Sequence, residues 1–367
     1  NQYRTQPHGG FHLHPLQTTR MQLTVLIHVE KASVTGARDP IYLTRKIYRC
    51  GPSPRNGGPR PIENVIHRQP IWTQVTDLAM NLDLTRRTLL HLAGASSFAA
   101  AAAGAARAEG NAGSGGPTFA NRTPMRIGTV TMRVRKLDAV ADFYRDVLGL
   151  TVMERTVAGA VLGSDGVRLL VLEARPQAAD ESRKAAGLYH TAFLMPSRKD
   201  LARWLVHAAL HRVPLSGFAD HRVSESVYLD DPEGNGIEVY ADRDPSLWQW
   251  SDGTVTMGTD QLDIDGLVAL TDTRVSDYAR APEGLRIGHI HLRVGDLAQA
   301  DGFYRGALGF DPTRQRNGAA FLSSGRYHHH LGLNVWQSAG AGRRDDAATG
   351  LAWFSLEIEQ AELFAAR

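Results

Sequence analysis

Apolar and polar positions follow the same order several times in the part of the chain after residue 125. A stretch of alternating apolar and polar residues comes first, then one with helical spacing, then further alternating stretches. Alternation predicts a strand with one buried face, and helical spacing predicts a helix with a buried stripe. The first example opens with TVTMRV and continues into a helical pattern that ends at Gly149. Each round of this order predicts a β-α-β-β-β unit.

Two of these units are copies of each other. Residues 127–150 read IGTVTMRVRKLDAVADFYRDVLGL, and residues 287–310 read IGHIHLRVGDLAQADGFYRGALGF. A long internal repeat fixes the architecture before any other feature is considered. Opening strands at 187–196, GLYHTAFLMP, and at 350–358, GLAWFSLEI, start two more units. We therefore expect an α+β fold of tandem β-α-β-β-β modules, three complete and one truncated at Arg367.

The units group into two predicted domains. The first domain covers residues 125–245 and holds two units. A linker follows at residues 246–284, and the second domain covers residues 285–367 and is truncated at its C-terminus.

The first part of the chain has a different composition. Residues 1–79 mix Arg, Pro, Gly and His without periodicity, which predicts a loop-like or disordered segment, or one upstream of the natural start. Residues 80–108 contain Arg86-Arg87, an Ala-rich apolar run and a final Ala-Arg-Ala. This order is typical of a twin-arginine signal peptide. We expect export to the periplasm, with a cytoplasmic location as the alternative, and the Ala-rich run is too weakly hydrophobic for a membrane span.

Composition excludes some functions. The formal charge of +3 over 367 residues is too small to indicate nucleic-acid binding, and no basic run is interleaved with aromatics. Cys50 is the single cysteine, which excludes an internal disulfide and a cysteine-based zinc site.

The two copies differ where chemistry is expected. Thr129 and Thr131 of the first copy correspond to His289 and His291 of the second. Histidines kept in one copy of a duplicated scaffold indicate that a metal site exists in only one place.

The motifs resemble those of the vicinal oxygen chelate superfamily, which includes glyoxalase I, bleomycin-resistance proteins and extradiol dioxygenases. The resemblance covers residues 125–367 and is strongest to two-domain catechol 2,3-dioxygenase-like proteins of the bacillary type. It is carried by GLYHTAFLMP, IGHIHLRV, YHHHLGLNVW and DHRVSESVYLDDPEGNGIEVYADR. The last segment follows the extradiol dioxygenase signature from His221 through Tyr228 to Glu238, with one departure at Ala219.

The resemblance implies a metal held by two histidines and one carboxylate. His190 matches a ligand on an opening strand, and Glu238 matches the ligand on a last strand. The third ligand in the same domain would be Thr129, which is a poor ligand for Fe(II). Pairing unit two with unit three, and unit one with unit four, instead brings His289 to the site. If units one and two pair with each other, and three with four, each site stays incomplete.

Further residues are expected around the metal. His328, His329 and His330 are placed on the last strand of unit three, and His330 is favoured as a fourth ligand or as a donor to bound oxygen. His221 is expected to act as an acid or base beside the metal, and Tyr228 to hydrogen-bond the substrate.

The resemblance implies an Fe(II)-dependent extradiol dioxygenase acting on a small aromatic diol and O₂. The alternatives are a glyoxalase-type lyase or isomerase that uses four protein ligands and Ni or Zn, and a metal-free protein that binds an aromatic ligand. Mn, Ni and Zn remain alternative metals. A homo-oligomer is an open alternative to a monomer.

Overall fold

The computed structural model describes residues 23–26, 43–48, 61–67 and 118–358, and its elements follow the expected order. Within residues 118–358 the β-α-β-β-β order occurs three times. The first unit consists of β4 (Met125–Val134), α1 (Leu137–Leu148), β5 (Thr151–Thr156), β6 (Gly159–Ser164) and β7 (Val167–Ala174). The second consists of β8 (Gly187–Leu194), α2 (Arg198–Leu210), β9 (Gly217–Asp220), β10 (Ser224–Asp230) and β11 (Gly236–Asp242).

The third unit follows a connection that contains short elements only. The connection holds η3 (Pro245–Leu247), β12 (Trp250–Ser251), β13 (Thr254–Val255) and α3 (Ile264–Val268). The unit itself consists of β14 (Arg286–Arg293), α4 (Leu297–Gly306), β15 (Asp311–Arg316), β16 (Ala319–Ser323) and β17 (Leu331–Asn334). The strand β18 (Gly350–Ile358) comes next, and a short η2 helix (Phe119–Arg122) precedes β4.

Local sequence explains where the helices begin and end. Ser197 and Asp296 accept hydrogen bonds from backbone N–H groups in the first turns of α2 and α4, as good N-cap residues do. Helix α1 ends at Gly149, whose φ of 68° lies in the left-handed region. A side chain there would also meet the backbone nitrogen of Ala281 at 2.4 Å, so the position requires glycine.

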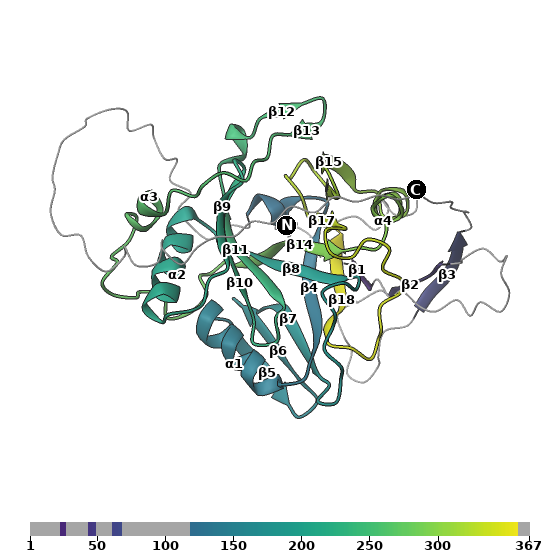
Figure 1. Ribbon diagram of the computed structural model, residues 1–367, viewed down its shortest axis with the longest axis horizontal. Helices are drawn as coiled ribbons and strands as arrows, with labels where there is room; N and C mark the ends of the chain where they lie inside the picture. Colours follow the sequence, from purple (N-terminus) through teal and green to yellow (C-terminus); the bar gives the residue numbers. More distant parts are fainter. Residues whose placement is uncertain (1–22, 27–42, 49–60, 68–117, 359–367) are drawn as a thin grey trace, which may run out of the picture.

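The two large sheets join units that are not neighbours in the sequence. One sheet has eight strands in the order β15-β16-β17-β14-β8-β11-β10-β9, and the other has six in the order β1-β18-β4-β7-β6-β5. Unit two therefore meets unit three through the antiparallel pair β8 and β14, and unit one meets β18 through β4. Figure 1 shows yellow β18 beside blue β4, and β14 beside β8. This is the pairing that the distribution of histidines predicts.

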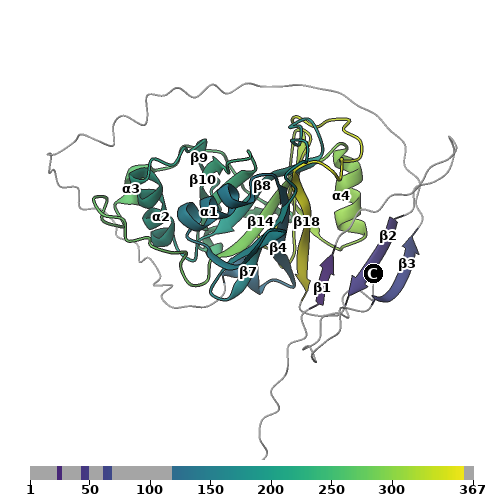
Figure 2. The same ribbon diagram turned by 90° about the horizontal axis from the view of Figure 1, so that it is seen from below.

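A common core connects the two sheets. The larger hydrophobic cluster includes Val130 of β4, Phe193 of β8, Ile290 of β14 and Leu356 of β18. Figure 2 shows these four strands side by side at the centre of the molecule. Each sheet therefore takes strands from both residue ranges predicted as domains, 125–245 and 285–367.

The opposite face of the eight-stranded sheet carries a second apolar cluster. Its members include Ala192 and Leu194 of β8 and Tyr240 of β11, which alternate with residues of the larger cluster. Trp248, from the connection after β11, packs against the same face.

Within residues 1–79, expected to be loop-like or disordered, the structure has three strands. These are β1 (Leu23–Leu26), which pairs with β18, and β2 (Leu43–Tyr48), which pairs with β3 (Pro61–His67). An unpaired edge such as that of β18 accepts a further strand, and the apolar LTVL stretch has the composition of one. The predicted signal peptide at residues 80–108 lies outside the described residues. No helix in the described part of the chain has the length and apolar character needed to cross a membrane.

Candidate metal centre

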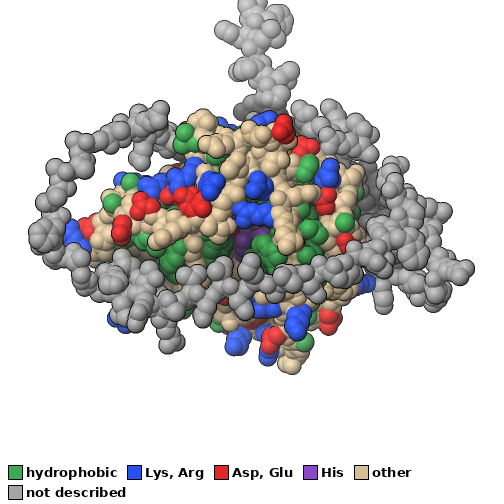
Figure 3. Space-filling model, turned by 45° about the horizontal axis from the view of Figure 1, so that its top comes forward, with side chains coloured by type: hydrophobic (Ala, Val, Ile, Leu, Met, Phe, Trp, Pro, Cys, Tyr) green, Lys and Arg blue, Asp and Glu red, His purple; other side chains and the backbone are tan. Residues whose placement is uncertain are grey.

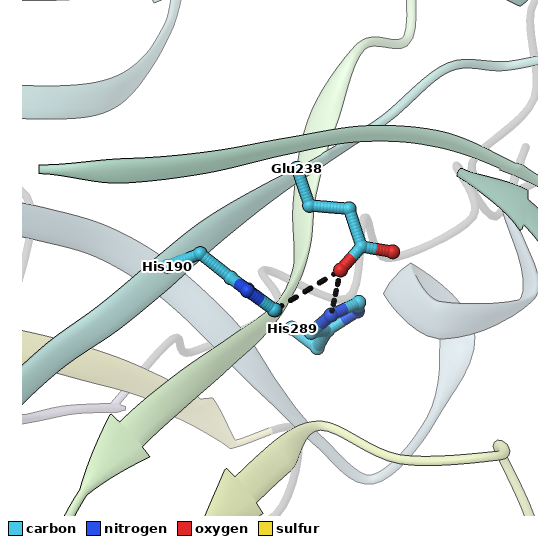
Figure 4. Close-up of side chains that lie close together, drawn as sticks. All are labelled: His190, Glu238 and His289. Carbon is cyan, nitrogen blue, oxygen red and sulfur yellow. Dashed lines mark hydrogen bonds and ion pairs between the residues drawn. The ribbon is translucent and has the colours of Figure 1, made fainter. Parts of the chain in front are cut away.

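Three strands that lie side by side bring the predicted ligands together. His190 lies on β8, Glu238 on β11 and His289 on β14. One donor atom from each residue lies within 4.8 Å of the donor atoms of the other two. Figure 4 shows both imidazoles directed at the same carboxylate oxygen. The His190 Nε2 lies 3.0 Å from the Glu238 Oε2, and the His289 Nε2 lies 3.2 Å from it.

The strand register explains this convergence. Glu238 and His289 are both partners of Ala192 in the sheet, one on each side of it. His190 lies two residues before Ala192 and so faces the same way. Because Ala192 carries only a methyl group, the space between the three ligands stays open.

A break in the register places His289 correctly. The pairing of β14 with β8 shifts between Ile287 and His289, so Gly288 has no partner of its own. A Cβ atom on Gly288 would lie 1.8 Å from the Tyr240 hydroxyl. Only glycine fits there, and this explains why the histidine follows a glycine in this unit.

The cluster is buried and its charges do not balance. The exposed fractions are 6% for His190, 2% for Glu238 and 1% for His289. Burial lowers the pKa of His289 to about 4, which makes this imidazole neutral. Burial also opposes the charge of Glu238, but the charge of His289 and the contacts with both imidazoles hold the pKa of its carboxyl well below the ordinary value. The lowered pKa of His289 means that its imidazole is neutral, whereas the lowered pKa of Glu238 depends on a charged imidazole.

A bound divalent cation removes this conflict. It supplies the positive charge that the carboxylate needs, and it takes lone pairs from neutral imidazoles. The His190 Nε2 is a buried nitrogen without a hydrogen-bond partner, although it lies 3.0 Å from the carboxylate. Buried polar atoms without partners are rare in proteins, and a metal provides the missing partner. The donor set of two imidazoles and one carboxylate therefore fits a metal ion.

His221 and Tyr228 form a pair beside this cluster. The Tyr228 hydroxyl lies 2.6 Å from the His221 Nε2, and the His221 Nδ1 lies 2.8 Å from the backbone oxygen of Gly258. The rings of Tyr228 and His190 are 5.7 Å apart, and Tyr228 is the strand partner of Glu238. Burial, followed by the charge of Glu238, raises the pKa of Tyr228 well above its ordinary value, so it remains a phenol.

The histidines 328–330 are placed differently from the expectation. They were expected on a strand, but β17 begins only at Leu331, so the three residues lie in the irregular segment before it. The structure does not bring His330 to the cluster. Its Nε2 lies 3.1 Å from the Thr123 Oγ1, and its Nδ1 lies 3.1 Å from the Ser323 Oγ. His329 instead packs against His289, with the ring centres 4.1 Å apart.

Two further residues lie near the site, and neither was predicted as a ligand. His291 is the strand partner of His190, and their ring centres are 4.9 Å apart. The Asn334 side-chain amide donates to the His291 Nε2 at 3.0 Å. The two-residue spacing of His289 and His291 indicates a shared strand face and could have identified this residue.

The six-stranded sheet lacks an equivalent site. Thr129 and Thr131 occupy the histidine positions, and Trp353 pairs with Thr131 as His190 pairs with His291. In the described part of the chain, the group of His190, Glu238 and His289 is the one cluster able to hold a metal ion.

Comparison with known proteins agrees with the repeated units. The sequence matches the Glyoxalase/Bleomycin resistance protein/Dioxygenase superfamily over residues 126–239 and 286–366. It is 41% identical over 241 residues to the catechol-2,3-dioxygenase of Bacillus subtilis, covering 64% of this chain and 84% of that protein. It is 28% identical over 121 residues to biphenyl-2,3-diol 1,2-dioxygenase 3 of Rhodococcus globerulus, covering 32% of this chain and 64% of that protein.

A solved structure of a glyoxalase I mutant from Zea mays is also similar, with a TM-score of 0.38 and 17% identity, covering 64% of this chain and 75% of that chain. The extent of the family match and the identity to the Bacillus subtilis protein show that this chain belongs to the glyoxalase/bleomycin resistance protein/dioxygenase superfamily.

Proposed function

We propose that this protein is an Fe(II)-dependent extradiol dioxygenase that cleaves the ring of a small catechol-like diol with O₂. The observation that carries this proposal is the convergence of His190, Glu238 and His289. Two histidines and one carboxylate on one side of a metal are the ligand set of non-haem Fe(II) oxygenases. The similarity to the Bacillus subtilis enzyme supports the same reaction.

The internal symmetry of the sheet supports three ligands over four. In unit two, Glu238 is the parallel partner of Ala192, which lies two residues after the ligand His190. In unit three, His291 lies two residues after the ligand His289, and its parallel strand partner is Gly332. The position that mirrors Glu238 therefore has no side chain, and a Cβ atom there would meet the His291 ring at 2.8 Å. The missing fourth ligand favours the dioxygenase over a glyoxalase-type site with four protein ligands. The three ligands that are retained disfavour a metal-free binding protein.

Fe(II) held by these three residues would bring both diol oxygens and O₂ together at its open positions. The protein supplies the surrounding environment. Trp248, Val255 and Met257 belong to the apolar cluster on the face of the sheet that carries the ligands. Figure 3 shows histidine at the bottom of a hollow flanked by hydrophobic side chains and by Lys or Arg side chains.

Hydrogen-bond directions assign a role to the Tyr228–His221 pair. The Gly258 carbonyl can only accept, so the His221 Nδ1 carries the proton and donates to it. The His221 Nε2 then accepts from the Tyr228 hydroxyl. Both His221 nitrogens are engaged, so His221 acts through Tyr228. The Tyr228 oxygen can accept a hydrogen bond from a diol hydroxyl while its own proton moves toward His221.

A second proton acceptor is His329. Burial lowers the pKa of His329 well below its ordinary value, so the imidazole is neutral. Its Nδ1 is hydrogen-bonded to His328, and its Nε2 has no protein partner in the described residues. A neutral imidazole beside a metal ligand is suited to take a proton from a diol.

Oxygen uptake tests the proposal. Anaerobically purified protein loaded with Fe(II) should consume O₂ when catechol is added and give a yellow ring-opened product. The matched control is the same protein after removal of the metal by a chelator. Turnover of methylglyoxal with a thiol, in the absence of catechol turnover, would support the lyase alternative and refute the proposal.

A further inference from the structure

One arginine at the edge of the eight-stranded sheet has no partner. Arg314 lies on β15, the edge strand of that sheet, and is half-buried. Within the described residues its guanidinium forms no hydrogen bond or ion pair, and its Nε is a buried atom without an acceptor. A buried donor of a charged group is costly to leave unpaired. The missing acceptor therefore indicates a ligand.

A β-bulge turns this arginine toward the face of the sheet that carries the metal ligands. The pairing of β15 with β16 shifts between Pro312 and Arg314, so Thr313 is the extra residue. Because of this shift, Arg314 rather than Thr313 is the partner of Phe321. Phe321 packs against the apolar cluster on the ligand face, and cross-strand partners share a face. The Thr313 hydroxyl holds the bulge by donating to the backbone oxygen of His328 at 2.6 Å.

Positive charge exceeds negative charge around Arg314. Arg316, on the same face of β15, donates to the backbone oxygen of Met257 at 2.7 Å. Arg222 approaches from the turn between β9 and β10 and lies 2.7 Å from the Asp260 carboxylate. Burial, followed by the charges of Arg314 and Arg222, lowers the pKa of Arg316, which shows that the three guanidiniums are close together. Among the described residues, Asp260 is the one group whose charge opposes this shift.

The duplicated unit shows that the fold does not require an arginine at this position. In unit one the same bulge lies between Val152 and Glu154, and Glu154 pairs with Val161 as Arg314 pairs with Phe321. The sheet that lacks the metal ligands thus has a carboxylate where the sheet with the ligands has a guanidinium. Since the same backbone accepts either charge, the arginine follows the function of its sheet.

The position of Arg314 determines which part of a substrate it can meet. Strand β15 lies three strands from β14, which carries the ligand His289. Neighbouring strands are about 4.8 Å apart, so roughly 14 Å separate the two backbones across the sheet. The arginine side chain covers part of this distance and is suited to a group at the far end of the substrate rather than to the diol oxygens. Figure 3 shows Lys or Arg side chains beside the hollow that has histidine at its bottom.

We propose that Arg314 binds a carboxylate of the substrate, so that the preferred diol is a catechol with an acidic side chain. The inference rests on the dioxygenase function proposed above. A planar guanidinium binds a carboxylate through two parallel N–H···O bonds, and Arg316 and Arg222 add positive charge at the same place. The carboxylate supplies the acceptor that the Arg314 Nε lacks.

A catechol with an acetate side chain and its neutral methyl ester test this inference, because they differ mainly in charge. In oxygen uptake with Fe(II), kcat/KM of wild type should be ~10–100-fold higher for the acid than for the ester, the usual effect of a charge-assisted hydrogen bond. Arg314→Gln should bring this ratio to within about threefold of one, and Arg314→Lys should keep part of it, because lysine retains the charge but not the two parallel bonds.

The matched control is Arg305→Gln. Arg305 belongs to the same unit but lies on α4, which packs against the other face of the sheet, and it pairs with Asp301 at 3.1 Å. This variant should keep the acid-to-ester ratio of wild type.

A binding measurement without metal separates this inference from the proposed function. Phenylacetate has the acidic side chain but no diol. At one hundred times its Kd it should raise the Tm of the metal-free full-length protein by roughly 5–10 °C in wild type and Arg305→Gln. It should give no such increase in Arg314→Gln, and the uncharged phenylacetamide should give none in any of the three proteins.

Equal kcat/KM for acid and ester in wild type would overturn the inference, and so would a ratio that survives in Arg314→Gln. An increase in Tm with sodium sulfate but not with phenylacetate would also overturn it, because the arginines would then hold a free inorganic anion. Failure of the proposed function has a different signature. Wild type would consume no oxygen with either diol, whereas the measurement with phenylacetate would still report on Arg314.

Discussion

Two carboxylates in the eight-stranded sheet are equally buried and have opposite surroundings. Glu238 and Glu225 are each 2% exposed. Glu238 faces two imidazoles, whereas Glu225 lies 2.5 Å from the Arg198 Nε and 3.3 Å from an Nη2 of Arg243. A metal site and a structural ion pair respond differently to the loss of their carboxylate. Replacement of each by Gln should therefore change the stability of the metal-free protein in opposite directions.

The expected magnitudes follow from the cost of burying charge. Near pH 7 the His289 imidazole is neutral and gives Glu238 no counter-charge. Glu238→Gln then removes an uncompensated buried charge, so the metal-free protein should gain about 1–3 kcal/mol. Glu225→Gln leaves two arginines without their shared carboxylate and should cost about 1–3 kcal/mol. This cost is below the roughly 3–5 kcal/mol of a broken buried pair, because the Arg198 and Arg243 side chains are 31% and 33% exposed. Each kcal/mol corresponds to roughly 2–4 °C in Tm.

Added metal provides the second half of the test. A ligand at one hundred times its Kd stabilises the folded state by about 2.7 kcal/mol. Wild type and Glu225→Gln should therefore melt several degrees higher with Fe(II) under anaerobic conditions than with EDTA. Glu238→Gln should show no such increase, and metal analysis should find no bound iron in it. Calorimetric melting of the three proteins, with and without EDTA, measures all of these quantities.

The reasoning would be refuted by either of two results. Glu238→Gln could melt below wild type in EDTA, as Glu225→Gln is expected to do, which would make the cluster a hydrogen-bonded core network. Glu238→Gln could also retain the bound iron and the metal-dependent increase in Tm. That result would place the metal elsewhere.

Three other substitutions and one processing experiment test the remaining assignments. Ala192→Leu should fill the space between the ligands and abolish iron binding while all three ligands remain, and a full complement of iron by metal analysis would contradict this. His221→Ala should keep iron but lower kcat by ~10²–10⁴ in oxygen-uptake assays, and an unchanged kcat would exclude a role in proton transfer. His330→Gln should keep one iron per chain, because His330 is bonded to Thr123 and Ser323 rather than to the cluster; loss of iron would restore it as a ligand. Protein recovered from the periplasm should begin after residue 108, and an N-terminus within residues 1–79 would exclude the export signal.

The ligand set could be predicted because it depends on positions within strands. Alternation fixes the face of each opening strand, and the loss of histidines at Thr129 and Trp353 left one pairing of units able to complete a site. The strand pairs β8–β14 and β4–β18 confirm that pairing. Turns are less predictable. The placement of His328, His329 and His330 depends on the residue at which β17 begins, and no periodicity marks that residue.

The contact of Asp242 could not be predicted from the sequence. The dioxygenase signature ends at Glu238, although the same strand face continues to Tyr240 and Asp242. Its partner, His328, belongs to a different unit and lies far from Asp242 in the sequence, so the sequence gave no indication of this contact. Only the pairing of unit two with unit three brings His328 to this carboxylate.

The duplicated scaffold also shows why a metal site is kept or lost as a whole. When unit one is compared with unit two, and β18 with β14, the positions equivalent to His190, Glu238 and His289 hold Thr129, Val171 and Trp353. A sheet that kept only the carboxylate would bury an uncompensated charge, at a cost of several kcal/mol. Two imidazoles without the carboxylate would bury nitrogens without partners. At a buried site, a partial donor set is therefore less stable than the complete one. The six-stranded sheet holds none of the three ligands, and its Thr129, Val171 and Trp353 are only half-buried.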